Sequence, residues 1–144
     1  MSLAVSSIAL RAIPAAFILN SGLGKLQTPP EASAGMQQFA ATGISAVNKL
    51  PADKFGKILG AAETALGAAL LTPFVSNRLA GAGLTAFGAG LMTLYFGNEG
   101  NTEDDGIRPS SDGTTLAKDS WLVALGVGLM ALPKGEKKAK KNKK

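Results

Sequence analysis

The chain contains no cysteine and no histidine. Without cysteine there are no disulfides, no thiolate nucleophile and no cysteine-ligated iron–sulfur cluster. Without histidine the chain lacks the usual haem and zinc ligand, and the side chain that most often moves protons near neutral pH. We therefore expect no metal site and no bound cofactor, and a chain that brings almost no redox chemistry of its own.

Charge and aromatic side chains are also scarce. Charged residues make up 17% of the 144 residues, against about 25% in typical soluble domains. Most of them lie in two hydrophilic segments and a tail, which leaves the apolar segments nearly free of charge. The 18 glycines suit helices that approach closely in lipid, where small residues replace the hydrophobic drive available in water. The composition predicts an all-α integral membrane protein and gives no indication of nucleic-acid binding.

Apolar segments of membrane-spanning length predict an integral membrane four-helix bundle. A short turn between the second and third segments makes them antiparallel neighbours. For the first segment, a cleaved signal peptide is the alternative, but Arg11 follows part of the apolar run and no Ala-x-Ala site comes after it. The spans are expected at about 3–26, 55–74, 79–97 and 116–132.

The two predicted outer segments differ in character. In segment 27–54, apolar residues recur at steps of three and four, which predicts an extra amphipathic helix from Glu31 to Lys49 between spans one and two. It would lie on the membrane surface or cover the bundle, with a soluble partner helix as the alternative interpretation. Segment 98–115 is acidic and rich in glycine, which predicts a solvated loop, and its oxygen spacing does not fit a calcium loop.

A lysine-rich tail, 134–144, follows the last span. Positive residues beside a span favour the cytoplasmic side, so four spans place both termini in the cytoplasm. We expect the tail to be disordered and to contact anionic lipid, or a protein partner, through Lys137, Lys138, Lys140 and Lys141.

Two charges, Arg11 and Glu63, are placed deep in predicted spans. A carboxylate in hydrocarbon is costly and marks a functional site unless it is paired. We predict that Arg11 and Glu63 form a buried ion pair that sets the register of the first two spans, with Lys25 as the rival partner of Glu63. The functional alternative is a proton or quinone-headgroup site at Glu63, with Asn20 and Ser21 as nearby polar lining.

These features together resemble the DoxX family of small four-helix bacterial membrane proteins. The resemblance rests on the first-span Ser-Gly-x-x-Lys-Leu sequence and the glutamate before a glycine-rich apolar run, with weaker matches elsewhere; the matching positions are Arg11, Ser21, Gly22, Lys25, Glu63, Arg78, Lys118 and Asp119. It implies a multi-pass protein of the bacterial plasma membrane that serves as a subunit or anchor in oxidoreductase or oxidative-stress assemblies. One family member is the small subunit of a thiosulfate:quinone oxidoreductase.

The sequence therefore predicts a DoxX-like accessory subunit, not itself an enzyme, that docks on and stabilises a larger plasma-membrane assembly of the respiratory or redox type. Its partners would be membrane protein subunits. The alternative is a small membrane subunit of a quinone-linked oxidoreductase with a site near Glu63. A transporter is disfavoured because the chain shows no inverted repeat. The long outer segments and the tail depart from the short family pattern and are expected to contact partners.

Overall fold

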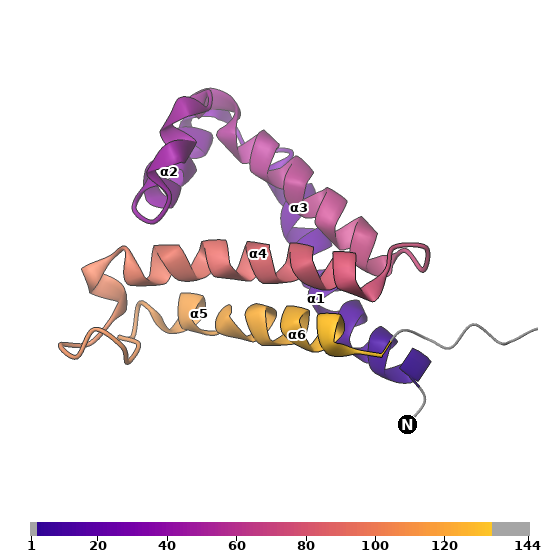
Figure 1. Cartoon of the computed structure of the whole chain (residues 1–144). Coiled ribbons are helices and arrows are strands. Elements are labelled where there is room, and N and C mark those ends of the chain that lie inside the picture. The colour runs from indigo at the N-terminus through magenta and orange to yellow at the C-terminus, as the bar shows by residue number, and fades with distance from the viewer. Residues whose placement is uncertain (1–2, 134–144) are drawn as a thin grey trace, which may run out of the picture.

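The structure is a computed structural model that describes residues 3–133, and those residues form helices and loops without a β-sheet (Figure 1). The all-α prediction is confirmed. In chain order the elements are α1 (Leu3–Lys25), α2 (Pro30–Ala41), the 3₁₀ helices η1 (Ser45–Lys49) and η2 (Ala52–Lys54), α3 (Phe55–Leu71), α4 (Asn77–Phe96), η3 (Glu99–Asn101), α5 (Thr114–Ala117) and α6 (Ser120–Ala131).

Local signals explain several helix ends. Pro30 occupies the first turn of α2, where its missing N–H costs nothing. Thr72 ends α3 in an extended conformation because it precedes Pro73, which disfavours helical backbone before it. Ser76 caps α4 by accepting a hydrogen bond from the Leu79 N–H at 3.2 Å. The short connection between α3 and α4 is therefore fixed on both sides.

The helices form two antiparallel pairs, α1 with α3 and α4 with α6 (Figure 1). Glycines allow the helices of each pair to approach closely. A Cβ atom added at Gly60 of α3 would lie 2.8 Å from the Gly22 carbonyl oxygen of α1, and one at Gly81 of α4 would lie 2.5 Å from the Gly126 carbonyl oxygen of α6. The glycines of the third predicted span thus serve the close helix contact that was expected of them.

The two pairs meet in a core near the α3–α4 turn. Its fully or almost fully buried members come from all four long helices: Ala15, Ile18, Leu70, Ala80, Leu84 and Leu129. Towards the other end α3 diverges from α4, and α2 lies in the angle between them and contacts both (Figure 1). The chain after α2 touches the end of α4, because a Cβ at Gly43 would lie 2.5 Å from the Thr93 backbone.

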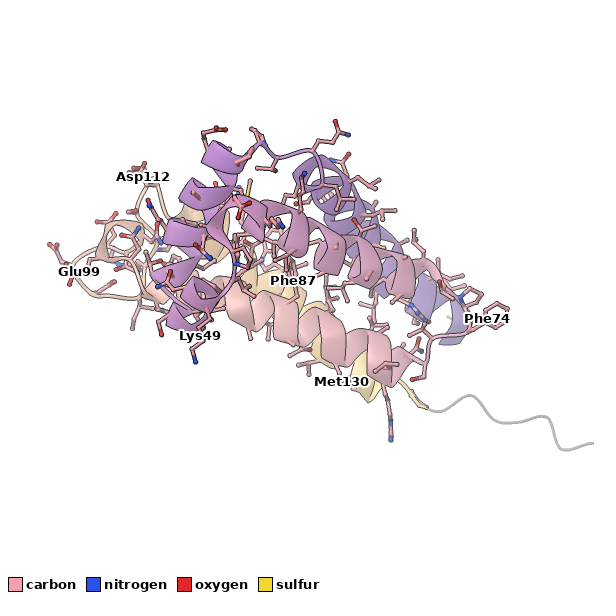
Figure 2. The ribbon with its side chains drawn as sticks, turned by 90° about the horizontal axis from the view of Figure 1, so that it is seen from above. Lys49, Phe74, Phe87, Glu99, Asp112 and Met130 are labelled. Atoms are coloured by element: carbon pink, nitrogen blue, oxygen red, sulfur yellow. The ribbon has the colours of Figure 1, made fainter. Side chains whose placement is uncertain are left out.

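Both predicted outer segments lie at one end of the molecule. Lys49, Glu99 and Asp112 mark this end, while Phe74 in the α3–α4 turn lies at the opposite end (Figure 2). The predicted topology requires both outer segments at one end and the turn between spans two and three at the other, and the arrangement agrees with it. It does not assign either end to a side of a membrane.

Two helices among the described residues are long and apolar enough to cross a membrane, Val5–Lys25 and Asn77–Phe96. Core helices and signal sequences pass the same test, so the structure supports membrane association only in this general sense. The predicted fourth span, 116–132, is divided at Lys118 and Asp119 into α5 and α6. With 12 residues α6 extends about 18 Å, so the four-span bundle stays a prediction.

The predicted amphipathic helix from Glu31 to Lys49 is shorter than expected. α2 ends at Ala41, and the chain continues through a turn into η1. The buried side chains of α2 are polar: Gln37 donates to the Val47 and Leu50 carbonyls, both at 2.8 Å, and Ser33 to the Ala52 carbonyl at 2.6 Å. Since these bonds satisfy the carbonyls of the following loop, the polar face turns inward, while Phe39 stays 43% exposed.

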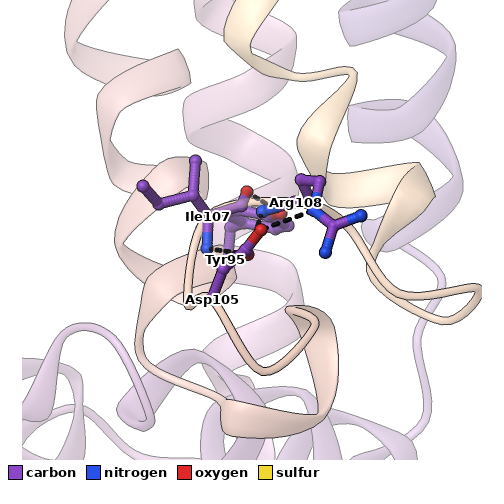
Figure 3. Close-up of polar contacts among 4 residues, drawn as sticks. All are labelled: Tyr95, Asp105, Ile107 and Arg108. Carbon is purple, nitrogen blue, oxygen red and sulfur yellow. Dashed lines mark hydrogen bonds and ion pairs between the residues drawn. The ribbon is translucent and has the colours of Figure 1, made fainter.

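The acidic segment 98–115 is a mostly exposed loop that contains the single turn η3 and leads into α5. Asn101, which is buried, donates to the Leu94 carbonyl at 3.1 Å, and the Tyr95 hydroxyl donates to the Ile107 carbonyl at 2.8 Å (Figure 3). Asp105 accepts hydrogen bonds from the Ile107 and Arg108 backbone and from the Arg108 side chain. These bonds lower the pKa of the exposed Asp105 carboxyl.

Candidate functional site between the helix pairs

Glu63 forms its ion pair with Lys25, not with Arg11. The Lys25 Nζ lies 2.9 Å from Glu63 Oε2 and also donates to the Ser21 hydroxyl. Glu63 is 4% exposed, whereas the Lys25 side chain is 23% exposed. The predicted Arg11–Glu63 pair is therefore wrong, and the rival partner occupies that place.

The antiparallel register of α1 and α3 explains this correction. Gly22 packs against Gly60, which brings the end of α1 that carries Lys25 alongside Glu63. Arg11 lies 14 residues before Lys25, almost four turns earlier in α1, so it faces the other end of α3. A helix rises 1.5 Å per residue, so even a long arginine side chain does not reach back to Glu63 from there.

Arg11 instead caps the carboxyl end of α3. Its Nε donates to the Leu70 carbonyl at 2.7 Å, and its terminal nitrogens donate to the carbonyls of Ala69, Thr72 and Val75 and to the Asn77 side chain at 2.9 to 3.1 Å. These bonds use all five guanidinium N–H groups. The negative end of the helix dipole takes the place of a carboxylate partner, since the last carbonyls of a helix have no partner within it.

A cavity of about 600 Å³ lies between the two helix pairs, with the Lys25–Glu63 pair in its wall. Most of its lining is apolar, and Phe87 of α4 lies near the middle of the molecule (Figure 2). Side chains from α1, α3, α4 and α6 and from the turn before α6 line it: Ile13, Pro14, Phe17, Ile18, Ser21, Lys25, Glu63, Phe87, Leu91, Lys118, Asp119, Trp121, Leu122 and Leu125.

The predicted polar lining is only partly assembled. Ser21 lies at the ion pair, but Asn20 is exposed and does not line the cavity. Lys118 and Asp119 line the cavity, although they were predicted at the start of the last span and not at this site. Their position depends on how the second helix pair packs on the first, which no local pattern reveals.

The lysines of the predicted lipid or partner contact, Lys137, Lys138, Lys140 and Lys141, lie outside the described residues. Among residues 3–133, no three carboxylates come together in a way that could hold a metal ion. The absence of a metal and of a cofactor therefore stays a prediction.

Comparisons with protein-family models, with curated proteins and with solved structures find no match for this chain. The resemblance to the DoxX family thus stays a prediction that rests on the residues named above.

Proposed function

We propose that the chain is a DoxX-like integral membrane accessory subunit that docks on and stabilises a larger plasma-membrane assembly of the respiratory or redox type. The observation that carries this proposal is the outward orientation of large apolar side chains along the helices. The most exposed of them on α1, α4 and α6 are 61 to 74% exposed: Ile8, Ile13, Phe17, Leu79, Phe96 and Trp121. Water is a poor surrounding for so many such side chains, whereas lipid or apolar partner helices suit them.

The interior of the chain supports a structural role more than a catalytic one. Arg11 has every donor engaged in fixing the α3–α4 connection. Glycines and small residues fill the contacts within each helix pair. The chain also has no cysteine or histidine to act as nucleophile, redox ligand or proton shuttle.

In this proposal the outer segments and the apolar helix faces provide the contacts with protein partners. The lysine-rich tail holds both termini on the cytoplasmic side and contacts anionic lipid. The end that carries the α3–α4 turn then faces the cytoplasm. The partner assembly is expected in the bacterial plasma membrane.

A tagged chain tests both parts of the proposal. After a carbonate wash we expect the chain in the membrane pellet, and after gentle detergent extraction we expect membrane subunits to accompany it, identified by mass. Phe17→Asn on α1 should weaken this recovery, while Phe74→Asn, which changes an exposed apolar residue in the α3–α4 turn, outside the outer segments and the helix faces, should not. A chain that stays in the carbonate supernatant overturns the membrane proposal. If the chain is found in the pellet at normal abundance but no other protein accompanies it after detergent extraction, the subunit proposal is overturned.

The second candidate function is a small subunit of a quinone-linked oxidoreductase. The buried Lys25–Glu63 pair beside an apolar cavity favours it, because the lysine offers a hydrogen bond to a quinone carbonyl. It predicts that Glu63→Gln abolishes quinone-dependent activity of the purified assembly while the assembly stays intact. Equal activity of the variant and the wild type would exclude this role for Glu63.

A further inference from the structure

The ion pair at the cavity leaves hydrogen-bonding capacity unused. Lys25 has three N–H groups, and its two bonds go to Ser21 and to Glu63 Oε2. Among the described residues Glu63 Oε1 accepts no hydrogen bond, although Glu63 is 4% exposed. A carboxylate oxygen in apolar surroundings without a donor is costly. The cavity therefore presents a donor next to an acceptor, and both lack a protein partner.

The charges around the cavity cancel. Lys25 and Lys118 are balanced by Glu63 and Asp119. An anionic head group placed at the pair would meet the Glu63 carboxylate beside the lysine, and a cationic one would meet the lysine beside the carboxylate. An uncharged head avoids both repulsions.

The kind of uncharged head follows from the unused donor and acceptor. A hydroxyl accepts a hydrogen bond from Lys25 and donates one to Glu63. An ester or an oxidised quinone offers only acceptor oxygens, so it leaves the Glu63 oxygen without a donor. Leaving this acceptor unpaired costs free energy, so the site discriminates in favour of the hydroxyl.

The walls of the cavity fit an apolar chain. Phe87, Leu91 and Leu125 line the cavity, while Ile13, Phe17 and Trp121 line it and are 66 to 74% exposed. The exposed three form an opening on the side of the molecule, where the proposed function places lipid. The volume of about 600 Å³ lies within the usual range of ligand pockets, about 300–1,000 Å³.

We propose that this cavity binds a membrane lipid with an uncharged hydroxyl head, such as a monoacylglycerol, with the hydroxyl between Lys25 and Glu63. The acyl chain lies along the apolar wall and leaves through the opening beside Trp121. The inference goes beyond the accessory role and rests on the proposed membrane location. Its test measures lipid binding by the isolated chain, so it can fail while the membrane and partner experiments succeed.

Trp121 is the only tryptophan and lines the cavity, so it reports on the site. The purified full chain in detergent micelles is titrated with three dibrominated probes that share one acyl chain: a monoacylglycerol, the methyl ester and the ionised fatty acid. Bromine quenches indole fluorescence at short range. We expect saturable quenching by the monoacylglycerol and apparent affinities about tenfold weaker for the ester and the acid, the loss of about one hydrogen bond.

Variants locate the binding at the ion pair. Lys25→Met and Glu63→Gln should each weaken monoacylglycerol binding about tenfold. Lys57→Met removes an exposed lysine on the helix that carries Glu63, outside the cavity lining, and should leave binding unchanged. If the ion-pair variants do not fold, Ser21→Leu fills the cavity beside an intact pair and should abolish saturable quenching.

Equal quenching by all three probes would overturn the proposal, since it would reflect only partitioning into the micelle. Unchanged binding in the variants that alter the pair or fill the cavity would overturn it as well. Displacement of the monoacylglycerol by an oxidised prenylquinone of equal or higher affinity would also contradict the inferred head group and support the quinone alternative.

Discussion

Arg11 ties the start of α1 to the end of α3, and its replacement provides the sharpest test of the fold. The guanidinium donates five hydrogen bonds to four carbonyls and one amide oxygen. A hydrogen bond to a charged group contributes about 1.5–3 kcal/mol, but the contributions within one network do not add. Only the bond to the Leu70 carbonyl is fully buried, and water can reach the other acceptors once the arginine is gone.

We therefore expect Arg11→Met to lower the free energy of unfolding by about 3–5 kcal/mol, roughly the sum of one full and several discounted bonds. Arg11→Lys should lose about half as much, because an ammonium has three donors and no planar fork. Unfolding is followed by far-UV circular dichroism in mixed micelles with increasing denaturing detergent. Arg78→Met, which removes an exposed arginine near the start of α4, is the matched control and should change stability little.

Equal stability of the Arg11→Met and Arg78→Met variants would refute this reasoning. So would strong non-additivity between Arg11→Met and Glu63→Gln, because the structure gives these residues no shared contact, and residues that do not meet have additive effects.

Two further predictions concern the other charged contacts. Lys25→Met and Glu63→Gln should each lower the free energy of unfolding, because either change leaves the other residue of the pair without its partner. The double variant should lose less than the sum of the two single losses, and the same unfolding assay measures all three. In the acidic loop, the lowered pKa of Asp105 means that its hydrogen bonds contribute above the ordinary aspartate pKa and are lost as the pH falls through the lowered value. Arg108→Ala should raise the Asp105 pKa towards its ordinary value in an NMR titration, and an unchanged titration would contradict the contact.

The positions of the long helices could be predicted from the sequence because apolar length and local breakers set them. The first predicted span, 3–26, corresponds to α1, and 55–74 and 79–97 correspond to α3 and α4 within a few residues. Pro73 and the short turn after it also determine that α3 and α4 are consecutive and oppositely directed. The division of 116–132 was missed because the prediction treated Lys118 and Asp119 as part of one continuous helix.

The pairing of charges could not be predicted because it depends on the register between helices. Arg11 and Glu63 were paired because both lie deep in predicted spans, yet the register is set by the contacts of Gly22 and Gly60. Arg11 and Lys25 lie 14 residues apart on α1, so a different register would exchange one partner of Glu63 for the other. For the same reason the sequence indicates which charged side chains need a partner in the spans, but not which residues provide the contacts.

The inward face of α2 could not be predicted for a different reason. Apolar periodicity indicates which face of a helix avoids water, and the prediction turned that face towards the membrane or bundle. In the structure the loop after α2 has carbonyls that need donors, and Gln37 and Ser33 supply them from within. The need to satisfy backbone groups thus decides the inward face, which leaves Phe39 partly exposed for lipid or a partner.

A glycine comparison tests whether close helix contact, rather than helix propensity, governs this fold. Replacing a helical glycine by alanine normally stabilises a helix by about 1 kcal/mol. Gly24 near the end of α1 has open space around an added Cβ, so Gly24→Ala should be stabilising or neutral. At Gly60 the added Cβ would lie 2.8 Å from the Gly22 carbonyl oxygen and 2.9 Å from the Leu26 nitrogen.

Both of these neighbours are backbone atoms, one in α1 and one in the residue that follows it, and they cannot move aside as a side-chain tip can. Gly60→Ala must therefore push α1 away from α3, at a cost of about 1–3 kcal/mol, and the displacement also stretches the Lys25–Glu63 contact. The two variants should shift the unfolding midpoint in opposite directions. If both stabilised the chain to the same extent, α1 and α3 would not be in backbone contact, and the register that places Lys25 at Glu63 would have no basis.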